Sequence, residues 1–130
     1  MSKIAFIFPG QGAQAAGMGK DFYEQSATAR EVFDKASKLL GFSMPELCFE
    51  PNDRLDITEY TQAAMVTTSI AMMKVLEEKG VKPDVAAGLS LGEYCALAAA
   101  GVMSEEDAIK TVRQRGILMQ EAVPVGQGAM

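Results

Sequence analysis

Two short apolar segments, each ended by a glycine, set the strongest constraint on what this chain can fold into. Residues 4–8 (IAFIF) run into Pro9-Gly10, and residues 85–88 (VAAG) run into a serine that stands between two glycines. Continuous apolar runs of this length are typical of strands buried on both faces of a parallel sheet. Because long helical patterns separate and follow them, the sequence predicts an α/β fold.

Helical patterns cover most of the remaining chain. We expect one or two helices over 21–40, a long helix over 59–79, and two further helices over 91–100 and 104–122. The middle of the long helix is apolar on nearly every face, which predicts that it is buried. Residues 43–56 are broken by two prolines, and we expect them to be irregular.

Two parallel strands make a poor sheet, because both faces and both edges need cover. The sequence ends on GQGAM, residues 126–130, which resembles the opening of another element. We therefore expect residues 1–130 to be the incomplete N-terminal segment of a larger domain.

Composition excludes several classes of protein. Apolar residues make up 48% of the chain and charged residues 22%, an ordinary globular balance. A net charge of −5 with no cluster of basic residues argues against nucleic-acid binding. No run approaches the ~20 apolar residues of a membrane helix, and the N-terminus lacks the features of a signal peptide. Two cysteines without a CxxC pair favour the reducing cytoplasm.

The chain contains no histidine. This removes the commonest metal ligand and the commonest general base near neutral pH. Any mechanism that pairs a serine with a histidine must therefore take its histidine from outside these residues.

The segment GLSLG, residues 88–92, has the GxSxG pattern. The pattern alone is weak, but here it joins an apolar strand to a helix, the turn on which a nucleophilic serine is exposed. Ser90 is therefore the candidate nucleophile. The backbone N–H of Leu91 lies where a helix begins, so it is placed to stabilise an oxyanion. The alternative is that Ser90 only caps the helix.

The loop PGQG, residues 9–12, directly follows the first strand. Its glycines allow backbone amides to approach a ligand, and it lies at the carboxyl end of a strand, where open α/β sheets bind ligands. The loop matches neither a P-loop nor a GxGxxG motif. A plain turn is the alternative interpretation.

The last helix carries an arginine, Arg115, on one face with three apolar residues, namely Ala108, Val112 and Met119. An inward guanidinium needs an anion, which is either a structural carboxylate of the protein or the carboxylate of a ligand. Spacing alone favours the structural partner. Arg113 lies off this face, and we expect it near Glu106 and Lys110.

Two other residues are notable on the helices predicted to be buried. Gln62 needs a hydrogen-bond partner inside the protein. Cys95 follows Ser90 by five positions, and we expect it to be an inert apolar residue.

Three motifs, taken together, resemble the malonyl-CoA:acyl-carrier-protein transacylases. They are FPGQGAQ (8–14), GLSLGEY (88–94) and RQRG with MQEAVP (113–116 and 119–124), in the same order and at the same spacing as in that family. The resemblance covers the whole chain. One departure is Leu89, where the family usually has histidine before the serine.

The resemblance implies an α/β-hydrolase-like acyltransferase domain with a parallel sheet. Ser90 would carry malonyl as an ester, Gln11 and Leu91 would supply oxyanion-hole amides, and Arg115 would bind the free malonyl carboxylate. The partners would be malonyl-CoA and acyl carrier protein in fatty-acid synthesis, with no cofactor and no metal. The family's catalytic histidine and ferredoxin-like subdomain lie beyond residue 130, so we expect this segment alone to be nearly inactive.

Three rival readings differ in testable ways. An α/β-hydrolase esterase shares the GxSxG turn but needs no inward arginine. A noncatalytic module that binds CoA or carrier protein would form no adduct at Ser90. A polyketide acyltransferase domain shares the same plan, although Met1 stands just before the first strand, which favours a freestanding enzyme.

Overall fold

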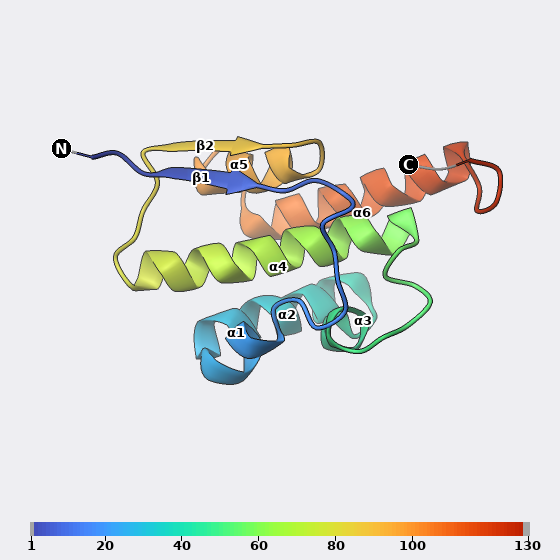
Figure 1. Cartoon of the computed structure of the whole chain (residues 1–130), viewed down its shortest axis with the longest axis horizontal. Coiled ribbons are helices and arrows are strands. Elements are labelled where there is room, and N and C mark those ends of the chain that lie inside the picture. Colours follow the sequence, from blue (N-terminus) through green and yellow to red (C-terminus); the bar gives the residue numbers. More distant parts are fainter. Residues whose placement is uncertain (1, 129–130) are drawn as a thin grey trace.

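The computed structural model describes residues 2–128, which fold as a small parallel sheet packed on helices (Figure 1). The strands are β1 (Ala5–Phe8) and β2 (Val85–Gly88). The helices are α1 (Lys20–Gln25), α2 (Ala27–Leu40), α3 (Met44–Phe49), α4 (Thr58–Glu78), α5 (Gly92–Ala99) and α6 (Glu105–Ala122). The predicted α/β class is therefore confirmed.

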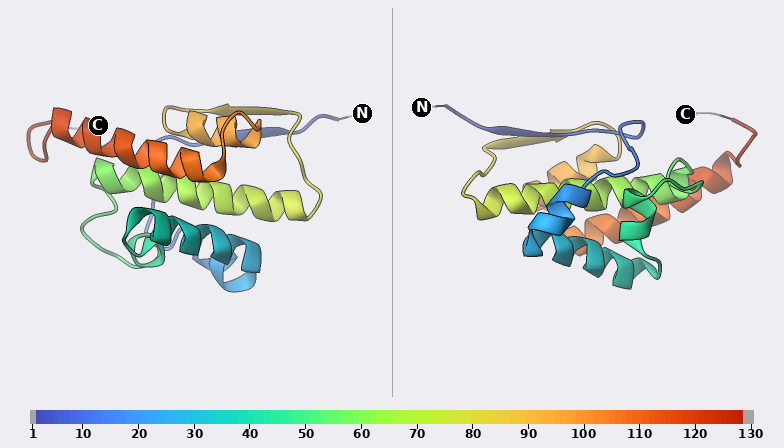
Figure 2. Two further views of the ribbon diagram at one scale, coloured as in Figure 1. Left: turned by 180° about the vertical axis from the view of Figure 1, so that it is seen from behind. Right: turned by 60° about the horizontal axis from the view of Figure 1, so that its bottom comes forward.

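Helix α4 forms the middle of the molecule. In Figures 1 and 2 the two strands and α5 lie on one side of it, α1, α2 and α3 lie on the other, and α6 runs alongside. Most of its residues from Thr61 to Val75 are buried, including Ala63, Val66 and Ile70 at 0% exposure. A helix surrounded in this way must be apolar on nearly every face, so the sequence prediction for this helix is confirmed.

The prediction that both strands are buried on both faces is wrong. Phe6 and Phe8 point into the core, but Ile7 on the opposite face is 78% exposed and Val85 is 60% exposed. The described helices cover one face of the sheet. Apolar strand residues on the other face therefore remain in contact with solvent, and a continuous apolar run could not distinguish the two faces.

One helix prediction is wrong, and another that left one or two helices open is now resolved. Residues 43–56 were expected to be irregular, but they contain α3, which Ser43 caps by accepting a hydrogen bond from the Glu46 amide at 3.2 Å. Pro45 stands in the first turn, where its missing N–H costs no helical hydrogen bond. The segment 21–40 is two helices, α1 and α2, separated at Ser26.

The other helices match their predicted positions closely. Ser104 caps α6 by accepting from the Asp107 amide at 3.0 Å. After α6 the chain turns through Gly126, and the prediction of a new element at 126–130 extends to residues 129 and 130, which lie outside the described residues. Within 2–128, no helix is long and apolar enough to span a bilayer.

Candidate active site

Parallel pairing brings the two glycine-rich loops together. Phe8 is the register partner of Gly88, so both strands end at the same edge of the sheet. The Leu89 amide extends this pairing by donating to the Phe8 carbonyl at 3.1 Å. The loop that carries Gln11 therefore lies beside the turn that carries Ser90, at the edge where α/β sheets bind ligands.

Three glycines make this close approach possible. A β-carbon at Gly88 would lie 2.1 Å from the backbone carbonyl carbon of Gly92, and one at Gly92 would lie 2.5 Å from the Phe8 oxygen. A β-carbon at Gly10 would lie 2.9 Å from the Leu89 oxygen. Strand β2, helix α5 and the loop after β1 are thus in backbone contact, and any larger residue would push them apart.

Ser90 occupies the strained turn that its motif predicts. Its φ of +52° lies in the left-handed region, and Ser90 is the only non-glycine with positive φ among residues 2–128. The alternative that Ser90 caps the helix is wrong, because α5 has no side-chain capping bond. The exposed hydroxyl instead accepts a hydrogen bond from Arg115 Nη2 at 3.3 Å. A side chain held out of the helix by a costly backbone is typical of functional sites.

Replacing Ser90 with glycine is expected to yield a more stable protein than replacing it with alanine, by about 0.5–1 kcal/mol. Glycine adopts the left-handed conformation without the strain of roughly 1–2 kcal/mol that alanine would carry. Part of this gain is offset because glycine has a higher conformational entropy in the unfolded state. Urea denaturation of the two variants measures the difference. Equal stability would mean that residue 90 does not adopt this turn in solution.

Two backbone N–H groups beside Ser90 have no hydrogen-bond acceptor in the part of the chain that the structure describes. Among the described residues, neither the Gln11 N–H nor the Leu91 N–H donates a hydrogen bond to any protein acceptor. Leu91 lies at the start of α5, where the helix dipole favours negative charge. Free amides at such a position are suitable donors for a developing oxyanion.

Arg115 reaches the serine from α6 but meets no acidic partner. Its Nη1 donates to Gln62 Oε1 at 2.6 Å, and its guanidinium lies 5.6 Å from the centre of the Tyr94 ring. Within residues 2–128, no carboxylate oxygen lies within 4.0 Å of its nitrogens. The structural carboxylate that spacing favoured is therefore absent from these residues.

Arg113 shares α6 with Glu106 and Lys110, near which it was expected, but its ion-pair partner is on another helix. It pairs with Glu59 of α4 at 3.4 Å and donates to the Glu59 carbonyl. Its guanidinium also packs on two rings of neighbouring elements, 5.2 Å from Phe42 and 4.8 Å from Tyr60. Arg113 therefore ties α6 to the start of α4, whereas Arg115 faces the serine.

Helix α4 supplies two polar side chains to the same place. Gln62, at 0% exposure, finds the hydrogen-bond partners that its burial required, since it donates to Gln11 Oε1 at 3.0 Å and accepts from Arg115. Thr58 accepts from Gln11 Nε2 at 3.0 Å. Sequence reasoning did not assign Thr58 to the site, because the first residue of a helix carries no signal of what lies opposite it.

Cys95 is not a competing nucleophile. It is buried on α5, and burial raises the pKa of its thiol to about 12. The thiolate is the reactive form, so this cysteine is inert near neutral pH, as expected.

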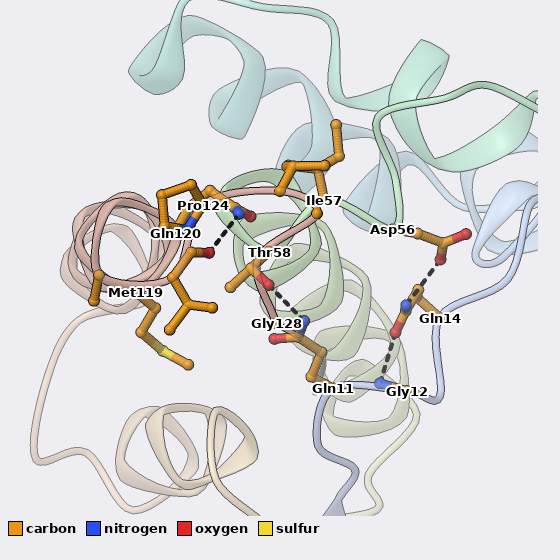
Figure 3. A pocket seen from close by; sticks show the side chains of 14 residues that line it. Gln11, Gly12, Gln14, Asp56, Ile57, Thr58, Met119, Gln120, Pro124 and Gly128 are labelled. Atoms are coloured by element: carbon orange, nitrogen blue, oxygen red, sulfur yellow. Dashed lines mark hydrogen bonds between the residues drawn. The ribbon is translucent and has the colours of Figure 1, made fainter.

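A pocket of about 570 Å³ adjoins the Gln11 side of the site (Figure 3). Gln11 and Thr58 line it together with Met119 near the end of α6, and in the figure the Gln11 side chain points toward Thr58. Ser90 and Arg115 lie outside this pocket, and Arg115 lines a shallower hollow on α6. Ser90 is therefore exposed to solvent, and the pocket lies on the side of the site that holds Gln11.

Known proteins match this chain along its whole length. The acyl transferase domain family matches residues 5–130. The malonyl CoA-acyl carrier protein transacylase of Bacillus subtilis (strain 168) is 53% identical over all of this chain and 41% of its own length. The protein of the same name from Staphylococcus aureus (strain MSSA476) is 47% identical over all of this chain and 42% of its own length.

Solved structures agree with these relatives. The malonyl CoA-acyl carrier protein transacylase of Clostridium perfringens superposes with a TM-score of 0.90 at 48% identity, over 96% of this chain and 40% of that one. A malonyl-transacylase in complex with a type II acyl-carrier protein superposes with a TM-score of 0.88 at 44% identity, over 95% of this chain and 40% of that one.

The chain thus spans about two fifths of the length of the curated relatives it matches, and it corresponds to their N-terminal part. The matched residues 5–130 include the two loops and the helix that form the site. The chain belongs to the acyl transferase domain family.

Proposed function

We propose that this chain provides the nucleophile and the substrate clamp for transfer of malonyl from malonyl-CoA to the phosphopantetheine thiol of an acyl carrier protein, in fatty-acid synthesis. The observation that carries the proposal is the guanidinium of Arg115, which lies 3.3 Å from Ser90 Oγ without a carboxylate partner in residues 2–128. A malonyl group has a thioester carbonyl for the serine and a free carboxylate for the arginine. The names of the relatives support the same substrates.

The reaction proceeds in two steps through a malonyl-serine ester. Ser90 Oγ attacks the thioester carbonyl, the carbon–sulfur bond breaks, and CoA leaves as a thiol once it receives the serine proton. The thiol of the carrier protein then attacks the carbonyl carbon of the malonyl ester, the bond from that carbon to Ser90 Oγ breaks, and the thiol proton passes to Oγ. Such a covalent intermediate implies ping-pong kinetics.

The residues around Ser90 have separate roles. The N–H groups of Gln11 and Leu91 stabilise the oxyanion of each tetrahedral intermediate, because neither donates to another acceptor within residues 2–128. Arg115 binds the malonyl carboxylate through its planar fork of donors. The proton must pass through a base, and the family resemblance assigns this role to a histidine outside residues 1–130.

The proposal also includes the domain to which these residues belong and the location of the protein in the cell. The exposed apolar face of the sheet, with Ile7 and Val85, supports the view that residues 1–130 belong to a larger acyltransferase domain. The free thiols of Cys48 and Cys95 support a location in the cytoplasm, where thiols stay reduced.

Replacing Arg115 with alanine is expected to remove the preference for malonyl-CoA over acetyl-CoA, a loss of about 10- to 150-fold. The lost interaction is a hydrogen-bonded charge pair, worth roughly 1.5–3 kcal/mol, and acetyl has no carboxylate to make it. Calorimetric titration of both thioesters into wild type and variant measures the ratio.

The matched control is Arg113→Ala on the same helix. It removes an equal charge, but its partners are Glu59, Phe42 and Tyr60 rather than the site. It should lower stability and leave the malonyl preference in place. A preference that survives Arg115→Ala would favour the esterase alternative, which needs no such clamp.

A further inference from the structure

A continuous series of hydrogen bonds joins the loop after β1 to Arg115 and Ser90. Thr58 accepts from Gln11 Nε2 at 3.0 Å, and Gln11 Oε1 accepts from Gln62 Nε2 at 3.0 Å. Gln62 Oε1 accepts from Arg115 Nη1 at 2.6 Å, and Arg115 Nη2 donates to Ser90 Oγ at 3.3 Å. Gln62 is the central member, because it contacts both Arg115 and Gln11, which lies on the loop of residues 9–12 after β1, here called the oxyanion loop.

Arg115 determines which group donates and which accepts in each of these hydrogen bonds. A guanidinium only donates, so Gln62 must turn its oxygen toward Arg115. Its NH₂ group then faces Gln11, which must present its own oxygen and turn its NH₂ group to Thr58. At the other end Ser90 accepts, which leaves the hydroxyl proton of Ser90 free for a base. Reversing either amide would place two donors or two acceptors against each other.

Gln62 is also held rigidly. It is 0% exposed, and the close approach of α6 at Gly116 confines its side chain. A β-carbon at Gly116 would lie 3.0 Å from Gln62 Cγ and 3.0 Å from the Thr58 carbonyl oxygen. A buried amide without a hydrogen-bond partner destabilises the folded state by its full desolvation free energy. Gln62 therefore strongly favours the orientation in which it contacts both Arg115 and Gln11.

We propose that Gln62 is a positioning residue that aligns the carboxylate clamp with the oxyanion loop. It occupies Nη1 of Arg115, which directs Nη2 toward Ser90 and toward a ligand carboxylate bound there. Through Gln11 it also holds the loop after β1, whose backbone amide faces the developing oxyanion. The inference rests on the proposed function, and it assigns Gln62 an action through Arg115 and Gln11 rather than contact with substrate.

Two variants of Gln62 test this role from opposite directions. Gln62→Met keeps the length and burial of the side chain but removes both hydrogen bonds. Gln62→Glu keeps the shape but sets a carboxylate against Arg115, so it competes with the malonyl carboxylate and has no donor for Gln11. Thr67→Val is the control, since Thr67 is buried on the same helix and its hydroxyl makes no hydrogen bond within residues 2–128.

The measurement is the dissociation constant of malonyl-CoA and of acetyl-CoA for each form of the chain, by calorimetry. We expect Gln62→Met to reduce the malonyl preference about tenfold, Gln62→Glu to reduce it further, and Thr67→Val to leave it unchanged. Affinity for acetyl-CoA should stay constant throughout. The ¹⁵N amide resonance of Gln11 should shift in both Gln62 variants and stay in place in Thr67→Val.

The outcomes separate this inference from the proposal on which it rests. A folded wild-type chain without malonyl preference would overturn the proposed function and this inference together. A wild-type preference that persists in folded Gln62→Met and Gln62→Glu, with an unmoved Gln11 resonance, would overturn the positioning role alone. If Gln62→Met fails to fold, the near-isosteric Gln62→Glu decides by the same criteria.

Discussion

Replacing Gly88 with alanine is expected to cost at least about 3 kcal/mol of folding free energy. The new β-carbon would lie 2.1 Å from the backbone carbonyl of Gly92 and 2.3 Å from the Glu93 amide nitrogen. Overpacking against side chains costs roughly 1–3 kcal/mol, and here the obstacle is backbone, which yields less easily. Since domains of this kind are marginally stable, many molecules would unfold at modest temperature.

Chemical denaturation followed by circular dichroism measures this loss, with Gly41→Ala as the matched control. Gly41 has a φ of +80° and no neighbouring atom within 4 Å of a β-carbon, so its substitution costs left-handed strain of about 1–2 kcal/mol without a clash. Gly88→Ala should be clearly worse. Equal losses would show that the strand and helix are not in the contact described.

Malonyl transfer by the 130-residue chain alone is expected to be about 10²- to 10⁴-fold slower than by a chimera that supplies the rest of the enzyme. The chimera joins residues 1–130 to the remaining part of the Bacillus subtilis relative. The chain contains no histidine, and a positioned general base contributes roughly 10²–10⁴-fold. Without one, the Ser90 hydroxyl is a weak nucleophile at neutral pH.

Steady-state transfer of labelled malonyl to carrier protein measures both rates. Ser90→Ala in the chimera is the control and should abolish transfer. A chain that transfers as fast as the chimera would show that another group within residues 1–130 acts as the base, and the proposed division of roles would be wrong.

The parts of the fold that are fixed by local chemistry could be predicted from the sequence. The strand-to-helix turn at Ser90 follows from glycines whose small size is required by backbone contact, and the buried α4 follows from its uniform apolar surface. Helix α3 was not predicted, because two prolines suggested a break. Pro45 lies in the first helical turn, where proline is tolerated.

The partners of the arginines could not be predicted in the same way. Helical spacing indicates which face of α6 holds Arg113 and Arg115, but the partner of each depends on how α6 crosses α4. The two helices approach closely at Gly116, and there Arg113 lies against Glu59 and Arg115 against Gln62. The exposed face of the sheet was missed because apolar strand residues look alike whether or not another layer covers them.

Intact-mass spectrometry of the chimera before and after incubation with malonyl-CoA shows whether Ser90 carries the acyl group. We predict a single malonyl adduct that maps to Ser90, is absent from Ser90→Ala, and disappears when a phosphopantetheine thiol is added. An adduct on another residue, or a folded chimera that binds malonyl-CoA and forms no adduct, would contradict the assignment of Ser90 as the nucleophile.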